Sequence, residues 1–368
     1  MYTHQIRVLL VGVQYPHWGN CSGYAQFAGR MSSERFSTTL IKIPLGRDLM
    51  PAWLPGVGAA VRGIARRRGR LICDANAVFG ELRALGRWMK QGFDIVHFLD
   101  GEHAALMLPW MERFIHPGGR RTGFIASFHQ PPEILSTLIT QQAVSRLDRI
   151  VTLAPNQNDF FRQHNAQGRV RTILHGIDSE FFSPQASDTP ENGSFTLLTV
   201  GKWLRDHDAV RKTVEYMADE RKYCFHLVSP GCAWENLPPN VRVSSGISDA
   251  DLRNLYRNSS LLLLPLRDAT ANNALLEAAA CGLPLLTSNI EAVKAYFGPD
   301  AAFWVDDHDP HVLAGAIRTL CENRKLRLSL GRAARQRAEA LSWERIAPQF
   351  ESLYEELDFE ITGRRRPA

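Results

Sequence analysis

The chain has 368 residues, of which 45% are hydrophobic and 22% are charged, and its formal net charge is +5. This length favours about two domains, and the composition is typical of a globular protein rather than a disordered or fibrous one. No apolar run approaches the roughly 20 residues of a membrane-spanning helix, and the N-terminal apolar stretch is too short for a signal peptide. The six cysteines show no CxxC spacing, which disfavours a zinc site or disulfide framework and favours reduced thiols in the cytoplasm.

Strand–helix alternation begins at residues 6–13, an apolar strand followed by a loop that contains Gly19. A helix is expected from Gly23, with Ser22 as its N-cap. The two glycines would let a ligand approach the backbone closely, although their spacing is not GxGxxG. Further strands are expected at 95–99, 123–128, 149–153 and 170–174, and further helices at 102–114, 133–145 and 156–164. This alternation predicts a parallel sheet covered by helices.

Polar side chains at the ends of these strands are the functional candidates of the first half. They are Asp100, His129 and His175. His129 is the strongest of them, because it follows a strand directly and precedes two prolines. His97 lies inside its strand, and we expect it to pack in the core.

Arginines at residues 66–70 and 364–366 account for much of the positive charge. The first cluster favours a solvated segment, and the alternative is a basic helix that contacts an anionic membrane surface. The second cluster forms a basic tail.

The segment 183–194 is rich in Pro, Ser, Asp, Asn and Gly, and it is the expected linker. After it the alternation restarts, which predicts a second α/β domain and a ligand site in the cleft between the two domains. The expected strands are 195–200, 223–228, 241–243, 261–266, 285–287 and 303–305, and the expected helices are 208–220, 249–256, 274–281, 310–321, 325–340 and 343–357.

Residues 261–289 form a strand, a polar loop, a helix and another strand. Such a unit aims a helix N-terminus at the carboxyl edge of a parallel sheet, where free amides favour phosphate. Glu277, about one turn into the helix, is placed to accept hydrogen bonds from ribose hydroxyls, and the alternative is a solvated glutamate. Lys202 and Arg205 follow another strand end and could neutralise a diphosphate, the alternative being solvated surface cations. A Walker A motif is absent, and D-x-D patterns at 206–208, 249–251 and 307–309 are weak signals.

Four segments in the second half carry a resemblance to a known family. They are HGIDSEFFSP (175–184), TVGKW (199–203), SSGISDADLRNLYRNSSLLLLPL (244–266) and LLEAAACGLPLLTSN (275–289). In this order they resemble retaining glycosyltransferases of the GT-B fold, family 4 (glycosyl transferases group 1). The resemblance implies two Rossmann-like, doubly wound parallel-sheet domains that face each other across a cleft. The implied division is an acceptor-side domain at 1–182, a linker at 183–194, a nucleotide-sugar-binding domain at 195–342, and a C-terminal helix at 343–368 that crosses back to the first domain.

The function implied by this resemblance is hexosyl transfer, with retention, from a nucleoside-diphosphate sugar to a hydroxyl acceptor. No metal ion, cofactor or nucleic acid is expected, and the expected location is the cytoplasm, with peripheral membrane contact through Arg62–Arg70 as an alternative. By resemblance His129 faces the reacting sugar, Ile247 lies against the base, and Glu277 holds the ribose. The expected catalytic residues are His129, Lys202 and Arg205, and the expected nucleotide-sugar-binding residues are Gly19, Gly23, Ile247, Asp268, Ala269, Thr270, Asn272, Asn273, Ala274, Leu275 and Glu277.

Two positions depart from the family pattern. Ala269 stands where the family carries a second glutamate, eight residues before Glu277, and His207 stands where it carries a lysine. We expect Arg205 to supply the missing cation. The alternative function is that of a nucleotide-sugar-binding protein that has lost transfer. An epimerase or phosphorylase on the same fold is less favoured, since no segment resembles a pyridoxal-phosphate lysine site.

Overall fold

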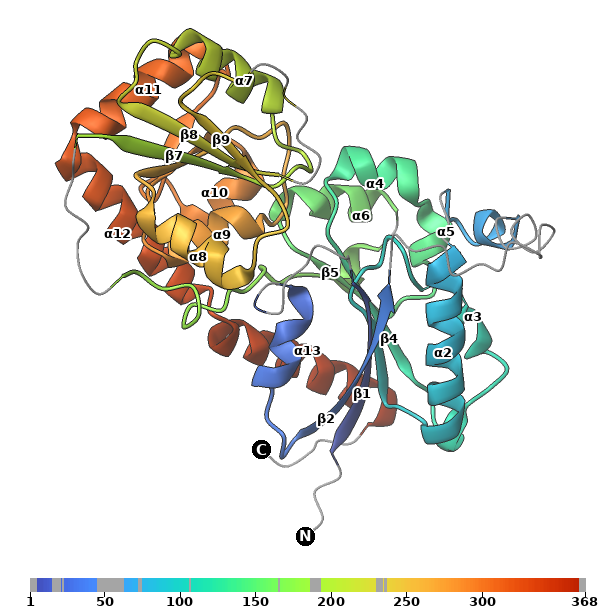
Figure 1. The fold of residues 1–368 in the computed structure, drawn as a ribbon. Coiled ribbons are helices and arrows are strands. Elements are labelled where there is room, and N and C mark those ends of the chain that lie inside the picture. Colours follow the sequence, from blue (N-terminus) through green and yellow to red (C-terminus); the bar gives the residue numbers. More distant parts are fainter. Residues whose placement is uncertain are drawn as a thin grey trace. The chain divides into compact units, whose positions relative to one another are not determined.

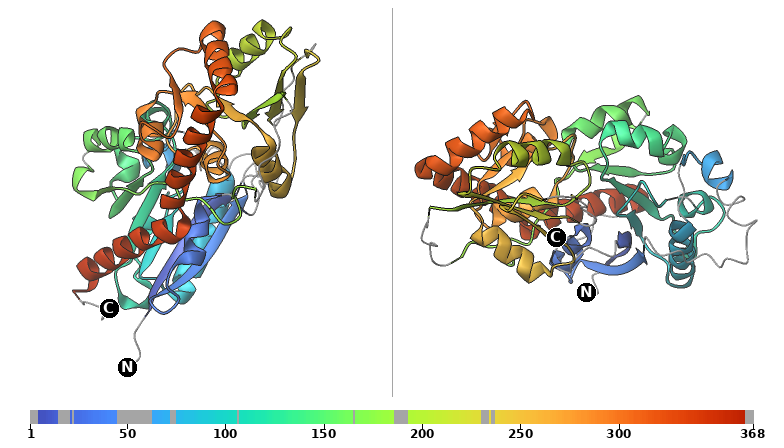
Figure 2. Two further views of the ribbon diagram at one scale, coloured as in Figure 1. Left: turned by 90° about the vertical axis from the view of Figure 1, so that its left-hand side faces the viewer. Right: turned by 45° about the horizontal axis from the view of Figure 1, so that its top comes forward.

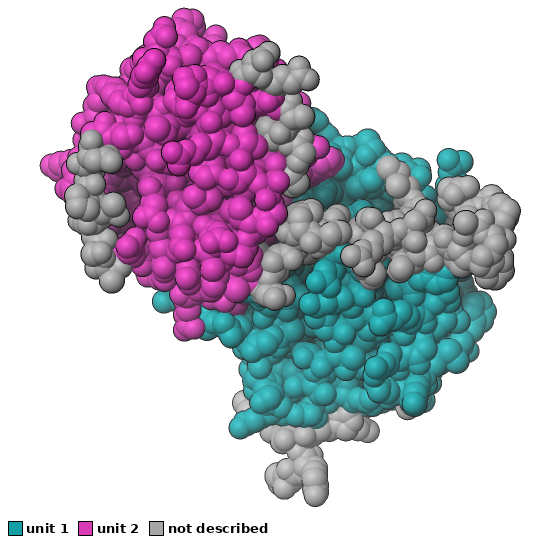
Figure 3. All heavy atoms as spheres, in the orientation of Figure 1, with its two compact units in different colours: residues 1–18, 24–175, 344–368 teal, residues 19–23, 176–343 magenta. Residues whose placement is uncertain are grey.

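A computed structural model describes residues 5–14, 21, 23–44, 63–71, 75–105, 107–164, 166–185, 193–229, 234 and 237–363. The chain divides into two compact units (Figures 1 and 3). Unit 1 comprises residues 1–18, 24–175 and 344–368, and unit 2 comprises residues 19–23 and 176–343. No helix in the described part of the chain is long and apolar enough to cross a membrane.

The sheet of unit 1 has six parallel strands in the order β2-β1-β3-β4-β5-β6. Its central strands are buried along their whole length, as expected for a parallel sheet that helices cover on both faces. The strands are β1 (Ile6–Gln14), β2 (Phe36–Pro44), β3 (Ile95–Phe98), β4 (Gly123–Phe128), β5 (Arg149–Thr152) and β6 (Val170–Thr172).

Unit 2 has a second sheet of six parallel strands, in the order β12-β11-β10-β7-β8-β9. The strands are β7 (Phe195–Val200), β8 (Tyr223–Val228), β9 (Val241–Ser244), β10 (Leu261–Leu264), β11 (Leu285–Ser288) and β12 (Phe303–Val305). The predicted fold class, two Rossmann-like α/β domains with parallel sheets, is therefore confirmed.

Helices connect the strands of both units (Figure 1). Those before β7 are η1 (Tyr24–Arg30), α2 (Ala75–Gln91), α3 (Leu108–Met111), η2 (Pro117–Gly119), α4 (Pro132–Leu138), α5 (Gln141–Val144), η3 (Pro155–Gln157), α6 (Asn158–Gln163) and η4 (Gln167–Arg169). Those after β7 are α7 (His207–Tyr216), α8 (Asp249–Asn258), α9 (Asn273–Ala280), α10 (Glu291–Phe297), α11 (Pro310–Glu322), α12 (Arg324–Ala340) and α13 (Trp343–Thr362).

The C-terminal helix α13 packs against the sheet of unit 1 (Figure 2). Phe350 stacks on Phe27 with ring centroids 4.2 Å apart, and the hydroxyl of Tyr354 bonds Nδ1 of His97 over 2.7 Å. Residues 344–368 belong to unit 1, although the chain reaches them from unit 2.

Two predicted helices of unit 1 are wrong. The expected helix 102–114 is a turn followed by the short α3, because Ala105 adopts a positive φ of 68° that interrupts a right-handed helix. The expected helix 133–145 is split into α4 and α5 because Ile139 between them is extended and forms a β-bridge with Arg70. The helix expected from Gly23 is the 3-10 helix η1, and its expected N-cap Ser22 lies outside the described residues.

Sequence analysis did not predict β2, α2 and α10. In β2 the β-branched residues Thr39, Ile41 and Ile43 occupy every second position, which is a typical strand pattern. In α2 the buried residues Ala77, Glu81, Ala84 and Trp88 recur at helical spacing. Both signals were present in the sequence.

Candidate functional site

The strand order of unit 2 creates a topological switch point between β7 and β10. The chain leaves β7 toward β8 and β9 and later returns on its other side at β10, so residues 201–206 and 265–272 meet at one edge of the sheet. These two loops are joined by backbone bonds, among them one from the amide of Asp206 to the carbonyl of Pro265 over 2.9 Å. In open α/β sheets, ligands bind outside the carboxyl ends of the strands at such a point.

Helix α9 begins at this edge. Its N-cap is Asn272, whose Oδ1 accepts the amide of Leu275 over 3.2 Å. The helix is buried from Ala274 to Ala280, so it is held rigidly against the sheet. Amides in the first turn and the helix dipole favour an anion at this end. The structure therefore places the predicted residues Asn272, Asn273, Ala274 and Leu275 at the switch point.

Arg205 connects the two loops. Its guanidinium donates to the carbonyl of Val200 over 3.2 Å, to that of Trp203 over 2.5 Å and to Oδ1 of Asn272 over 3.2 Å. Burial lowers its pKa to about 10, against the raising effect of Tyr256 and Glu277, so it remains charged at neutral pH. Three of the five N–H donors of the side chain are used in these bonds. Arg205 thus places a positive charge beside the N-terminus of α9 while it fixes the loop after β7.

Glu277 is buried rather than solvated. The residue is only 4% exposed, and its Oε2 accepts the hydroxyl of Tyr256 over 2.9 Å. This excludes the alternative interpretation of Glu277 as a glutamate on a solvated helix face. Tyr256 comes from α8, so the carboxylate is held between two helices of the same unit.

The other predicted donor-site residues follow the same edge. Asp268 is half-buried, and its carboxylate accepts the amide of Ala269 over 2.7 Å. Ala269 and Thr270 are buried at 3% and 4% exposure. Ile247 is half-buried in the loop before α8, and Lys202 is exposed. Ala269 presents only a methyl group where the family that the chain resembles carries a glutamate, so no carboxylate occupies that position.

His207, which stands where the family that the chain resembles carries a lysine, is the first residue of α7. Its Nε2 pairs with the carbonyl of Gly201 over 3.1 Å, and its enclosed Nδ1 has no hydrogen-bond partner among the residues described. Burial lowers the pKa of His207, and the positive charges of Arg205 and Lys202 lower it further. At neutral pH His207 is uncharged, which leaves Arg205 and Lys202 as the predicted cations.

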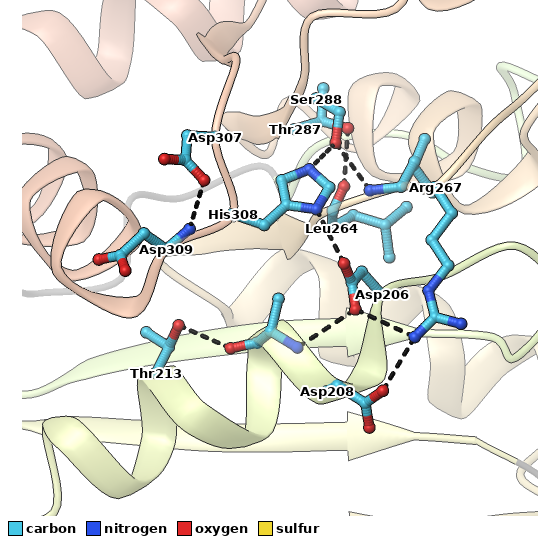
Figure 4. A network of polar contacts seen from close by, with 12 residues as sticks. Asp206, Asp208, Thr213, Leu264, Arg267, Thr287, Ser288, Asp307, His308 and Asp309 are labelled. Carbon is cyan, nitrogen blue, oxygen red and sulfur yellow. Dashed lines mark hydrogen bonds and ion pairs between the residues drawn. The ribbon is translucent and has the colours of Figure 1, made fainter.

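A polar network that sequence analysis missed ties the donor loops to the neighbouring strands (Figure 4). His308 lies at its centre, with Nδ1 3.0 Å from Oδ2 of Asp206 and Nε2 2.6 Å from Oγ of Ser288. Ser288 in turn accepts the amide of Leu266 over 2.7 Å. Residues that follow β7, β10 and β12 are thereby joined to the end of β11. The weak D-x-D patterns at 206–208 and 307–309 flank this network and were its only trace in the sequence.

Arg267 extends the network at the surface. Its guanidinium reaches Asp206 at 3.4 Å and Asp208 at 3.0 Å. Burial opposes ionisation of Asp206, but its bonds with His308, the amide of Ala209 and Arg267 lower its pKa overall. The aspartates of the first D-x-D pattern therefore serve as an N-cap and an ion-pair partner. No cluster of three or more His, Cys, Asp or Glu side chains arranged to hold a metal occurs in the described part of the chain.

The predicted catalytic His129 belongs to unit 1. It is half-buried, its Nε2 pairs with the carbonyl of Leu99 over 2.7 Å, and its ring packs edge-on against Tyr24 at 4.7 Å. The backbone amide of His129 donates to the carboxylate of Glu102, which also accepts the amide of Gln130. Bonds to backbone and ring thus fix the position of His129 at the carboxyl end of β4.

Asp100 and His175, the other strand-end candidates, are both buried in unit 1. Asp100 accepts the amide of Val13 over 2.6 Å, and burial raises its pKa. The ring of His175 lies 5.4 Å from that of Tyr24.

His97 packs in the core as predicted, but with specific polar partners. Its Nδ1 pairs with the hydroxyl of Tyr354 over 2.7 Å and its Nε2 with that of Ser127 over 2.8 Å. The hydroxyl of Ser127 also forms a hydrogen bond with the hydroxyl of Tyr24 over 3.0 Å. Burial lowers the pKa of His97 to about 3, so it is neutral.

The glycines and arginines of the predicted contact sites are only partly described. Gly19 lies outside the described residues, and Gly23 has a φ of 127°, a conformation that favours glycine. Arg62 also lies outside them, whereas Arg66 and Arg67 are exposed. Arg70 is the exception to the predicted surface cluster.

Arg70 is 3% exposed, and its guanidinium donates to the carbonyls of Gly101 and Ala104. The favoured prediction of a solvated segment is therefore wrong for Arg70, because long-range backbone partners draw its side chain into the unit.

Comparison with known proteins identifies similar chains. Residues 233–337 match the family described as glycosyl transferases group 1. The chain is 24% identical over 325 residues to D-inositol 3-phosphate glycosyltransferase of Salinispora arenicola (strain CNS-205), covering 75% of this chain and 72% of the relative. It is 28% identical over 317 residues to the protein of the same name from Corynebacterium glutamicum (strain R), covering 76% of each.

Solved structures share the fold over almost the whole chain. Sucrose-phosphate synthase from Thermosynechococcus elongatus is similar with a TM-score of 0.69 and 16% identity, covering 96% of this chain and 99% of that one. The Anabaena protein Alr3699/HepE, solved in complex with UDP and glucose, gives a TM-score of 0.63 and 11% identity over 95% of this chain and 99% of that one. The family match, the relatives and the shared fold together support a glycosyltransferase with the GT-B fold.

Proposed function

We propose that the protein transfers a sugar from a nucleoside-diphosphate sugar to a hydroxyl group of an acceptor, with retention of anomeric configuration. The observation that carries this proposal is the guanidinium of Arg205, bonded to the N-cap of α9 at the switch point of unit 2. A guanidinium, the exposed ammonium of Lys202 and a helix N-terminus together suit a diphosphate. The complex of Alr3699/HepE with UDP and glucose supports the choice of a nucleotide donor.

In the proposed reaction, the bond between the anomeric carbon and the diphosphate oxygen breaks, and a bond to the acceptor oxygen forms on the same face of the sugar. The acceptor proton passes to the leaving diphosphate. Negative charge grows on that diphosphate as the bond breaks, so Arg205, Lys202 and the amides of α9 stabilise the transition state more than the bound donor.

Three further residues have roles in this proposal. The buried carboxylate of Glu277 accepts hydrogen bonds from the ribose hydroxyls, and Tyr256 holds it in one orientation. Ile247, half-buried in the loop before α8, packs against the base. His129, fixed by Leu99, Glu102 and Tyr24, faces the transferred sugar.

A thermal-shift screen against UDP-, GDP-, ADP- and TDP-sugars tests the donor. A ligand that binds only the folded state raises the melting temperature of the protein. We expect the sugar nucleotides of one base to do so. Nucleotide release is then measured with D-inositol 3-phosphate and with other hydroxyl acceptors, and the anomeric configuration of the product is read by NMR. No shift with any sugar nucleotide would contradict the proposal.

A second candidate is a nucleotide-sugar-binding protein without transfer activity. Ala269 favours it, because its buried methyl group cannot replace a carboxylate directed at the sugar. Tight donor binding without nucleotide release across a broad acceptor panel would support this second function. Restored release in an Ala269→Glu variant would identify the missing carboxylate as the cause.

A further inference from the structure

The loop after β7 presents a large aromatic side chain to solvent. Trp203 is 61% exposed, and it is the only exposed tryptophan among the residues that the structure describes. It directly follows the exposed Lys202, at the edge of the sheet where β7 and β10 form the switch point. A tryptophan this exposed leaves a wide apolar surface in water, which is unfavourable unless something covers it.

The backbone on both sides of Trp203 is held in place. The carbonyl of Trp203 itself accepts the guanidinium of Arg205 over 2.5 Å, and Arg205 forms a β-bridge with Leu266. Leu204 adopts a positive φ of 60°, which is uncommon for a residue other than glycine. Such strain persists where the surrounding structure enforces it, and it is concentrated at functional sites.

Gly201, at the start of this loop, lies close to the side chain of Arg205. Its φ is 90°, and a Cβ there would lie 3.0 Å from Nη2 of Arg205. The loop therefore turns the Arg205 side chain inward and leaves the side chains of Lys202 and Trp203 exposed. An exposed tryptophan that directly follows an exposed lysine in one loop matches a ligand that carries both a ring with apolar C–H groups and an anionic group.

We propose that the indole of Trp203 is a stacking surface for a pyranose ring. This inference rests on the proposed function, since the ring is either the transferred sugar of the donor or a sugar of the acceptor. Pyranoses present C–H groups on their ring faces, and tryptophan offers a large rigid surface at little cost in conformational entropy. Lys202 then pairs with the phosphate of the same or the neighbouring ligand.

The test compares the full-length protein with Trp203→Ala and Trp203→Tyr. Calorimetry measures the affinity for UDP and for UDP-glucose, and saturation-transfer NMR measures binding of methyl α- and β-D-glucopyranoside. Tyr216→Ala, which removes another exposed aromatic side chain of unit 2, is the control.

If the ring belongs to the donor, Trp203→Ala lowers the affinity for UDP-glucose about tenfold and leaves the affinity for UDP unchanged. A tenfold loss corresponds to one aromatic contact of about 1.4 kcal/mol. If the ring belongs to the acceptor, the saturation-transfer NMR signal of the methyl glucosides disappears in Trp203→Ala instead. In either case Trp203→Tyr retains most of the binding. Equal effects on UDP and UDP-glucose, together with an unchanged glucoside signal, overturn the inference.

The proposed function fails in a different way. Absence of UDP and UDP-glucose binding in the unmodified protein would contradict the donor proposal, whereas the glucoside measurement would still decide the role of Trp203.

Discussion

The Nη2 atom of Arg205 donates a hydrogen bond over 3.2 Å to Oδ1 of Asn272, the residue that caps helix α9. The same oxygen accepts the amide of Leu275, also over 3.2 Å. One carboxamide therefore fixes both the loop after β7 and the start of the helix. Because these two elements form the proposed diphosphate site, helix capping and donor binding depend on the same side chain.

We expect Asn272→Asp to separate stability from donor binding. An aspartate is an equally good N-cap, and its charge suits both the helix dipole and Arg205, so the melting temperature stays the same or rises. The added negative charge repels a diphosphate, so affinity for the donor nucleotide falls roughly tenfold. Calorimetry and thermal unfolding measure the two effects.

Asn323→Asp is the matched control, because Asn323 caps α12 through an equivalent bond to the amide of Leu326 over 3.0 Å. It should leave donor affinity unchanged. If Asn272→Asp bound the donor as tightly as this control, the diphosphate would not lie at the start of α9.

Substitution of Arg205 should lower both stability and donor binding, whereas substitution of Lys202 should lower donor binding alone. Arg205→Ala removes the hydrogen bonds that the guanidinium donates to the carbonyls of Val200 and Trp203, which costs about 1–3 kcal/mol in the free energy of unfolding and also weakens donor binding. Lys202 is exposed, so Lys202→Ala should change stability by less than about 0.5 kcal/mol while it weakens donor binding at low salt. Urea unfolding measures the stability of the two variants, and donor turnover measures their activity. Unchanged turnover in Arg205→Ala, with turnover lost in Lys202→Ala, would show that Arg205 does not replace the missing lysine.

Glu277→Gln should abolish the preference for a ribonucleotide. The glutamine keeps an oxygen for the Tyr256 hydroxyl but loses the charge that strengthens hydrogen bonds from ribose. Affinity for UDP, or for the nucleoside diphosphate that the screen selects, falls about 10- to 100-fold, since hydrogen bonds to a charged group contribute about 1.5–3 kcal/mol.

The corresponding 2′-deoxynucleotide serves as the matched ligand. Its affinity should change far less between the two proteins, so the ratio of the two dissociation constants approaches unity in Glu277→Gln. A ratio that the substitution leaves unchanged would place the ribose away from Glu277.

The strand, loop and helix start at the switch point of unit 2 were predictable because their signals are local. Four consecutive leucines mark β10, and Ser248 and Asn272 are polar residues of the kind that cap helices, as they do for α8 and α9. The helix expected at 274–281 is α9, displaced by a single residue.

The errors arose where partners distant in sequence decide the structure. Arg70 looks like part of a solvated run, yet the carbonyls of Gly101 and Ala104 bury it. Glu102 looks like the start of a helix, yet its carboxylate accepts amides that follow β4. No local pattern reveals that Asp206, Ser288 and His308 meet, because parallel strands bring them together only after the sheet forms.

Donor turnover should not require a divalent metal ion. In the proposed mechanism, Arg205, Lys202 and the N-terminus of α9 supply the positive potential that the diphosphate needs. We expect the same rate before and after treatment with EDTA followed by desalting. A loss of activity that added Mg²⁺ or Mn²⁺ restores would contradict this prediction and assign part of the diphosphate charge to a metal.

The pH dependence of stability should reveal the network around His308. The pKa of Asp206 is lowered in the folded protein, mainly because its bonds with His308, the amide of Ala209 and Arg267 outweigh burial. A carboxylate with a depressed pKa stabilises the fold above its unfolded pKa, and this contribution is lost as the pH falls through the folded value. The loss therefore occurs below the ordinary pKa of 3.8. Above it, Asp206→Asn should lower the free energy of unfolding by about 1–3 kcal/mol, since bonds to a charged group are replaced.

Urea unfolding from pH 7 down to pH 3 measures this difference, which should be constant at the upper end and narrow as Asp206 is protonated. Asp208→Asn is the control, because the Asp208 side chain is 78% exposed and pairs only at the surface with Arg267. Such a pair contributes at most about 1 kcal/mol, and added salt weakens it. Equal destabilisation by the two substitutions at pH 7 would mean that the bond between Asp206 and His308 does not hold the donor loops together.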